Sequence, residues 1–126
     1  KKEVNPTQIR EISSLLNQNN EVLSVSTQKG FETLEISSLV RCEADGKYTH
    51  CIRLNGNSFI SSKNLKEFER LLSDKNFARV HHSHLINLNL IKSFNRYDSI
   101  VTMANQEEVP ISQRKKRGFI DKMNLI

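Results

Sequence analysis

The sequence predicts a single, mainly β domain with two or three short helices. A chain of 126 residues fits one domain, because domains commonly contain about 100–150 residues. From residue 21 onward, short runs rich in β-branched and aromatic residues are separated by turn-forming residues. Helical spacing of apolar residues is confined to short segments. Many short strands with few helices favour a β-rich fold.

The first predicted helix spans residues 5–20. Asn5 is suited to cap it and Pro6 to occupy its first turn, and an apolar stripe follows at helical spacing: Ile9, Ile12, Leu15 and Leu16. We expect residues 1–20 to be a linker helix from an upstream domain and residues 21–126 to form the domain proper. Packing of this helix onto the domain's own core is the alternative.

The clearest hairpin is LVRCEADGKYTHCIRL, residues 39–54, which follows β-like runs at residues 21–27 and 30–36. A three-residue loop, Ala44–Asp45–Gly46, with Gly46 in the left-handed conformation, is expected. It puts Val40 and Cys42 on one buried face together with alternate residues of the second strand: Tyr48, His50, Ile52 and Leu54. The same register puts Cys51 on the other face from Cys42, which argues against a disulfide.

The rest of the chain predicts two further helices and three further strands. In residues 61–75 a helix is capped by Asn64, with Glu67 three residues later. Strands are expected at residues 89–94, 99–103 and 107–112. A last helix is predicted from Gln113 to Met123, with Ser112 as its N-cap.

The net charge of +5 is concentrated in the C-terminal half. Residues 73–126 carry nine Lys or Arg against five Asp or Glu, a balance of +4, whereas residues 1–40 carry four against five. This distribution favours a polyanionic partner, nucleic acid before membrane, and a solvated basic face is the alternative. No apolar run approaches the roughly 18–20 residues of a membrane helix. With two cysteines and no disulfide framework, we expect a cytoplasmic protein.

Three histidines, His81, His82 and His84, lie within four positions. On a continuous strand His82 and His84 would share one face and His81 the other, too few neighbours for the three or four ligands of a zinc site. We therefore expect no metal, although a histidine metal site stays open as an alternative. No nucleophile elbow, phosphate loop or paired carboxylate motif is present, so neither an enzyme nor a cofactor is expected.

The run Arg114-Lys115-Lys116-Arg117 directly follows the predicted cap Ser112. Basic side chains in the first turn of a helix oppose its macrodipole, whose positive end lies there. The arrangement becomes favourable when an anion such as phosphate binds, because free N–H groups, dipole and side chains all attract it. Arg114 and Arg117 are three residues apart and are expected to project from one face.

Several phrases together resemble the LytTR family of bacterial DNA-binding domains, over about residues 30–123. They are RCEADGKYTHCIRL, SSKNLKEFERLL, FARVHHSHLINLNLIKSF and VPISQRKKRGFIDKM. The resemblance implies small stacked antiparallel sheets and a bacterial transcription regulator, commonly the output domain of a two-component response regulator with a receiver domain upstream. It implies double-stranded promoter DNA as partner, typically short direct repeats occupied by two copies, and no membrane.

The resemblance also assigns DNA-binding residues. Arg114 matches the base-reading arginine of the family, and Arg117 a basic position in the same helix. His82 matches a DNA-facing position, whereas His84 stands where an aromatic residue is usual and either packs or assists. The remaining expected contacts are Lys47, Tyr48, Gln113, Lys115 and Lys116. A protein-interaction module that uses the apolar stripe of residues 9–16 is the competing interpretation.

Overall fold

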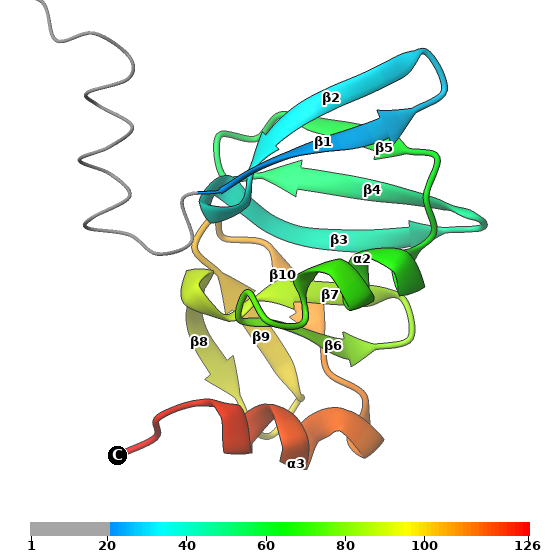
Figure 1. Ribbon diagram of the computed structural model, residues 1–126. Helices are drawn as coiled ribbons and strands as arrows, with labels where there is room; N and C mark the ends of the chain where they lie inside the picture. Colours follow the sequence, from blue (N-terminus) through cyan, green and yellow to red (C-terminus); the bar gives the residue numbers. More distant parts are fainter. Residues whose placement is uncertain (1–20) are drawn as a thin grey trace, which may run out of the picture.

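The computed structural model describes residues 21–126, and the helix expected at residues 5–20 lies outside this range (Figure 1). Within it, ten strands form antiparallel sheets ordered β1-β2, β5-β4-β3-β7-β6 and β10-β9-β8. The strands are β1 (Val22–Thr27), β2 (Gly30–Glu35), β3 (Leu39–Asp45), β4 (Tyr48–Arg53), β5 (Ser58–Ser61), β6 (Phe77–His81), β7 (His84–Asn87), β8 (Ile91–Asn95), β9 (Ile100–Met103) and β10 (Glu108–Pro110). This architecture confirms the predicted mainly β fold of small stacked antiparallel sheets.

The five-stranded sheet is the middle layer, and each of its faces covers a separate core (Figure 1). Strand β7 shows why, since Leu85 belongs to one core and its neighbour Ile86 to the other. The first core also contains residues from β1, β2 and helix α2 (Leu65–Leu72), and the second contains residues from β9, β10 and helix α3 (Gln113–Lys122). Strands β3, β7 and β6 each contribute residues to both cores, so they are buried on both faces.

Both helices of the described range begin where their caps predict. Asn64 accepts a hydrogen bond from the backbone N–H of Glu67 at 3.0 Å and opens α2. Ser112 accepts one from the N–H of Lys115 at 3.3 Å and opens α3. Phe119 anchors α3 in the second core, edge-on to Phe94 at 5.2 Å between ring centroids. Neither described helix has the length and apolar character needed to cross a membrane.

The register predicted for the β3–β4 hairpin is wrong. Asp45 pairs with Tyr48, so the loop has two residues, Gly46 and Lys47, with the left-handed φ of +59° at Gly46 as expected. Cys42 consequently lies opposite Cys51, and both are fully buried free thiols on one face.

The pattern of apolar residues does not predict two features of this hairpin. An irregularity between Leu39 and Arg41 shifts the register of β3 against β4, so the alternation of β3 changes face. On β4 the polar Thr49, two residues before Cys51 and on the same face, is buried as well, and its hydroxyl donates to the Lys63 carbonyl at 2.8 Å. A satisfied hydroxyl can occupy a core position that hydropathy alone assigns to solvent.

Candidate nucleic-acid interface

Three chain reversals lie along one edge of the molecule, on the right of Figure 1. They are the β3–β4 turn, the β6–β7 turn and the start of α3. Two backbone hydrogen bonds connect them: Ala44 N–H donates to the Ser83 carbonyl at 2.9 Å, and Ser112 N–H donates to the Val80 carbonyl at 2.9 Å. The relative positions of these reversals are thus set by the main chain.

The β6–β7 turn separates the three histidines differently from the predicted continuous strand. The chain reverses at His82 and Ser83, so His81 pairs with His84 on the same face, which corrects the expectation that His81 faces away. His82 sits exposed at the tip of the turn. The N–H of Ser83 donates to Nδ1 of His81 at 3.1 Å, a bond that the sharp reversal makes possible.

Arg79 holds the β6–β7 turn from behind. One guanidinium nitrogen donates to the carbonyl of His82 at 2.6 Å, and another contacts the Glu69 carboxylate on α2 at 3.0 Å. The side chain is 23% exposed. No local pattern in the sequence indicates this role, because the guanidinium binds the carbonyl of a turn three residues away and a carboxylate on another element.

The first turn of α3 presents its basic residues with no acidic residue in that turn. Gln113, Arg114 and Arg117 are exposed, whereas Lys115 and Lys116 are half-buried. Arg114 lines a hollow of about 250 Å³ between α3 and β6, while Arg117 lines another of about 440 Å³ on α3. These side chains and the free N–H groups of the helix start form a surface suited to phosphate or base edges.

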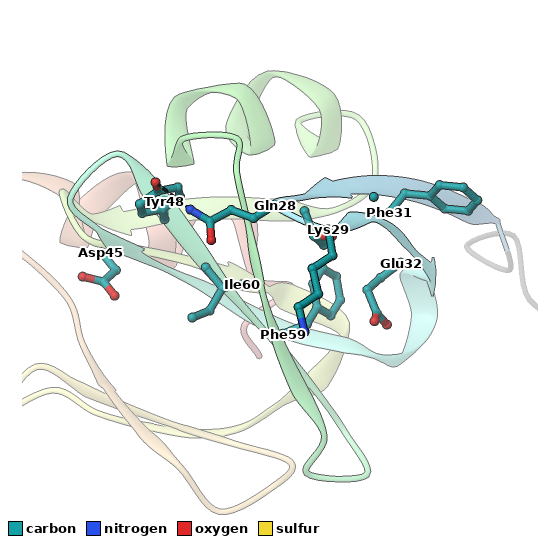
Figure 2. Close-up of a pocket in the computed structure, with 10 residues that line it drawn as sticks. Gln28, Lys29, Phe31, Glu32, Asp45, Tyr48, Phe59 and Ile60 are labelled. Atoms are coloured by element: carbon teal, nitrogen blue, oxygen red, sulfur yellow. Dashed lines mark hydrogen bonds between the residues drawn. The ribbon is translucent and has the colours of Figure 1, made fainter.

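The β3–β4 turn carries Lys47 and Tyr48 at the same edge. Lys47 is exposed, with its ammonium 5.7 Å from the centroid of the Tyr48 ring. The amide of Gln28 donates to the Tyr48 hydroxyl at 3.0 Å, as Figure 2 shows. This contact crosses a hollow of about 450 Å³ between the β1–β2 turn and β5. Tyr48 therefore ties the β1–β2 hairpin to this edge, a role that its place in the sequence did not indicate.

His84 lies half-buried behind the exposed edge. It faces Glu43 across strands, and Glu43 faces His50 on its other side. Burial lowers the pKa of His84 from its usual 6.5, Glu43 opposes this shift, and Arg41 reinforces it. The His84 Nδ1 is buried and has no hydrogen-bond partner among residues 21–126.

Arg41 bridges this group to the three-stranded sheet. It contacts Glu43 at 2.7 Å and Glu107 at 2.8 Å. The hydrogen bond from Arg41 lowers the pKa of Glu107, partly against the effect of burial. Over the described residues, no group of three or more His, Cys, Asp or Glu side chains is arranged to hold a metal ion.

The expected contact residues thus fall into two groups. The turns bring Lys47, His82, Gln113, Arg114 and Arg117 to the exposed surface of one edge and its adjoining helix. The half-buried residues of the set are Lys115, which lines the hollow beside Arg114, and His84, Tyr48 and Lys116, which contact other parts of the protein.

Comparison with known proteins decides the family. The sequence model of the LytTr DNA-binding domain matches residues 29–124. The chain belongs to the LytTR family of DNA-binding domains. A solved LytTr DNA-binding domain, from a Bacillus cereus protein described as a methyl-accepting/DNA response regulator, superimposes with a TM-score of 0.70 at 29% identity, covering 82% of this chain and 97% of that one.

Two curated proteins of Paraburkholderia xenovorans (strain LB400) are also similar to this LytTR domain. They are the heme-containing CO-sensing transcriptional regulators RcoM 1 and RcoM 2, at 28% and 27% identity over 86 residues. The match covers 65% of this chain and 32% of each regulator. The chain therefore spans about a third of the length of these relatives, and the family supports DNA binding in transcription regulation.

Proposed function

We propose that this LytTR domain binds double-stranded promoter DNA in a sequence-specific manner, with Arg114 reading a base edge. The observation that carries the proposal is the single edge on which three chain reversals present exposed basic or imidazole side chains. An arginine fork can bind guanine through two parallel hydrogen bonds, worth about 1–3 kcal/mol of discrimination. Arg117, Lys115, Lys47 and His82 would add phosphate or base contacts around it.

The wider setting is part of the same proposal. The response-regulator neighbour from Bacillus cereus supports a response regulator as the whole protein. The upstream receiver domain and the two copies on short direct repeats are proposed from the resemblance to the LytTR family. The RcoM relatives are named as heme-containing CO-sensing regulators, so domains similar to this one occur in regulators of more than one kind. We propose residues 1–20 as the connection to an upstream domain.

The decisive experiment compares two arginines of one helix. A binding-site selection supplies the duplex, and anisotropy titrations at several salt concentrations give its affinity and that of scrambled DNA. Arg114→Ala should reduce the preference for the selected duplex about tenfold or more. The matched change Arg117→Ala should weaken both duplexes alike and lower the salt slope by about one unit. If Arg114→Ala leaves the preference unchanged, its assignment as base reader is wrong.

A further inference from the structure

The β8–β9 turn, residues 96–99, presents an aromatic side chain that the fold does not use. Tyr97 is 98% exposed at its tip, between the exposed residues Arg96 and Asp98. An aromatic ring in water contributes no burial to stability, so this position is not explained by packing. Tyrosine and arginine are side chains that contact phosphates and sugars at protein–DNA interfaces.

The turn is fastened to the DNA-facing end of α3. The ammonium of Lys116 donates to the carbonyl of Arg96 at 2.9 Å, and the amide of Gln113 lies 3.4 Å from the hydroxyl of Ser99. The N–H of Ile111 donates to the Ser99 carbonyl at 2.8 Å. These contacts place the turn against the first turns of α3, on the side of Gln113 and Lys116, and Figure 1 shows the lower ends of β8 and β9 next to this helix.

The shape of the turn is held by its surroundings. Ser99 is buried and has a φ of +57°, a left-handed conformation that non-glycine residues disfavour. The side chain of Asn95 accepts from the N–H groups of Tyr97 and Asp98 at 2.9 and 3.4 Å. A conformation that is disfavoured locally persists because several contacts fix it, which presents Arg96 and Tyr97 in one arrangement.

We propose that the β8–β9 turn is a further DNA contact of this domain, next to the first turns of α3. Arg96 binds the phosphodiester backbone, and Tyr97 packs against or donates to the same backbone. The inference rests on the proposed function. Arg96, Lys116 and Arg117 outnumber the acidic groups near the turn, Asp98 and Asp121, so the local field favours a polyanion. Lys116 serves as the clamp that positions the turn.

The two tyrosines of the chain allow a direct test on the unaltered protein, because Tyr48 and Tyr97 are its only ones. Mild iodination, mapped by peptide mass spectrometry, should modify Tyr97 faster than the half-buried Tyr48 in the free protein. A saturating amount of the selected duplex should slow the reaction of Tyr97 severalfold. An unchanged rate at Tyr97 under saturation overturns the proposal.

A matched pair of variants on one strand and its turn gives an independent readout. Arg96→Ala should weaken binding of the selected and scrambled duplexes alike, by about threefold to tenfold, and lower the salt slope by about one unit. Lys92→Ala removes the same charge at the other end of β8 and should change neither quantity. If Arg96→Ala behaves as Lys92→Ala does, the turn is not a contact. If no duplex binds the wild-type chain, both proposals fall; if binding depends on Arg114 but not on Arg96, only this one falls.

Discussion

Replacing Arg79 by methionine should separate support of the interface from contact with DNA. Methionine keeps the length and apolar stem of the side chain but removes its bonds to the His82 carbonyl and the Glu69 carboxylate. A hydrogen bond from a charged donor contributes about 1.5–3 kcal/mol. The side chains of Arg79 and Glu69 are 23% and 41% exposed, so the ion pair itself contributes at most about 1 kcal/mol.

Water can solvate both partners after the substitution, because neither is deeply buried. We therefore expect Arg79→Met to lower the free energy of unfolding by about 2 kcal/mol, measured by urea denaturation. The β6–β7 turn keeps its bonds from Ala44 to Ser83 and from Ser83 to His81. The turn is loosened rather than lost, and affinity for the selected duplex should fall about tenfold.

The salt dependence distinguishes a support from a contact. Because Arg79 points back to Glu69 and the turn carbonyl, its loss releases no phosphate contact, and the salt slope should match that of the wild type. Arg117→Ala is the control whose slope should fall. A slope lowered by about one unit in Arg79→Met, together with an unchanged free energy of unfolding, would show that Arg79 faces DNA and that the structural reasoning is wrong.

Two further predictions concern groups behind the interface. Burial lowers the pKa of His84 from 6.5, so the imidazole binds a proton more readily in the unfolded chain than in the folded one. The free energy of unfolding should therefore fall as the pH drops below about 6.5. The variant His84→Phe should show a smaller fall in urea titrations from about pH 7.5 to about pH 5. Parallel pH curves for the two proteins would contradict this assignment. Cys42 and Cys51 are fully buried, and the hydrogen bond to Cys51, followed by burial, raises the pKa of Cys42. A thiol reagent such as Ellman's reagent should therefore modify both cysteines only after the protein unfolds. Rapid reaction of either thiol in the native protein would refute the observed register.

The sequence predicted correctly those features that depend on a few neighbouring residues, namely the helix starts and the turn glycine. The caps Asn64 and Ser112 lie at the starts of α2 and α3, and Gly46 adopts its left-handed turn conformation. Each of these depends on a few neighbouring residues. The helix predicted at residues 5–20 lies outside the described residues and stays a prediction.

The errors arose where distant residues decide the structure. In the β3–β4 hairpin, the unpredicted features are the irregularity after Leu39 and the bond from the Thr49 hydroxyl to the distant Lys63 carbonyl. The reversal at His82 is bonded to Ala44 of another strand and supported by Arg79. No periodicity within one segment contains these contacts, and the same limitation concealed the connection between the β8–β9 turn and α3.

Main-chain hydrogen bonds, and not the exposed side chains, fix the relative positions of the three chain reversals, which bears on how domains of this fold could differ in DNA sequence preference. The reversals are joined through main-chain atoms, from Ala44 to Ser83 and from Val80 to Ser112, and the exposed side chains of His82 and Arg114 take no part in these bonds. Substitution of an exposed side chain away from core and caps usually changes stability by less than about 0.5 kcal/mol. The side chains proposed to contact DNA can therefore be exchanged while the main-chain framework that positions them is retained. Arg79 holds the β6–β7 turn and Ser112 caps α3, and several exposed side chains depend on each of these elements for their position. Substitution of either residue should therefore lower both the free energy of unfolding and the affinity for DNA.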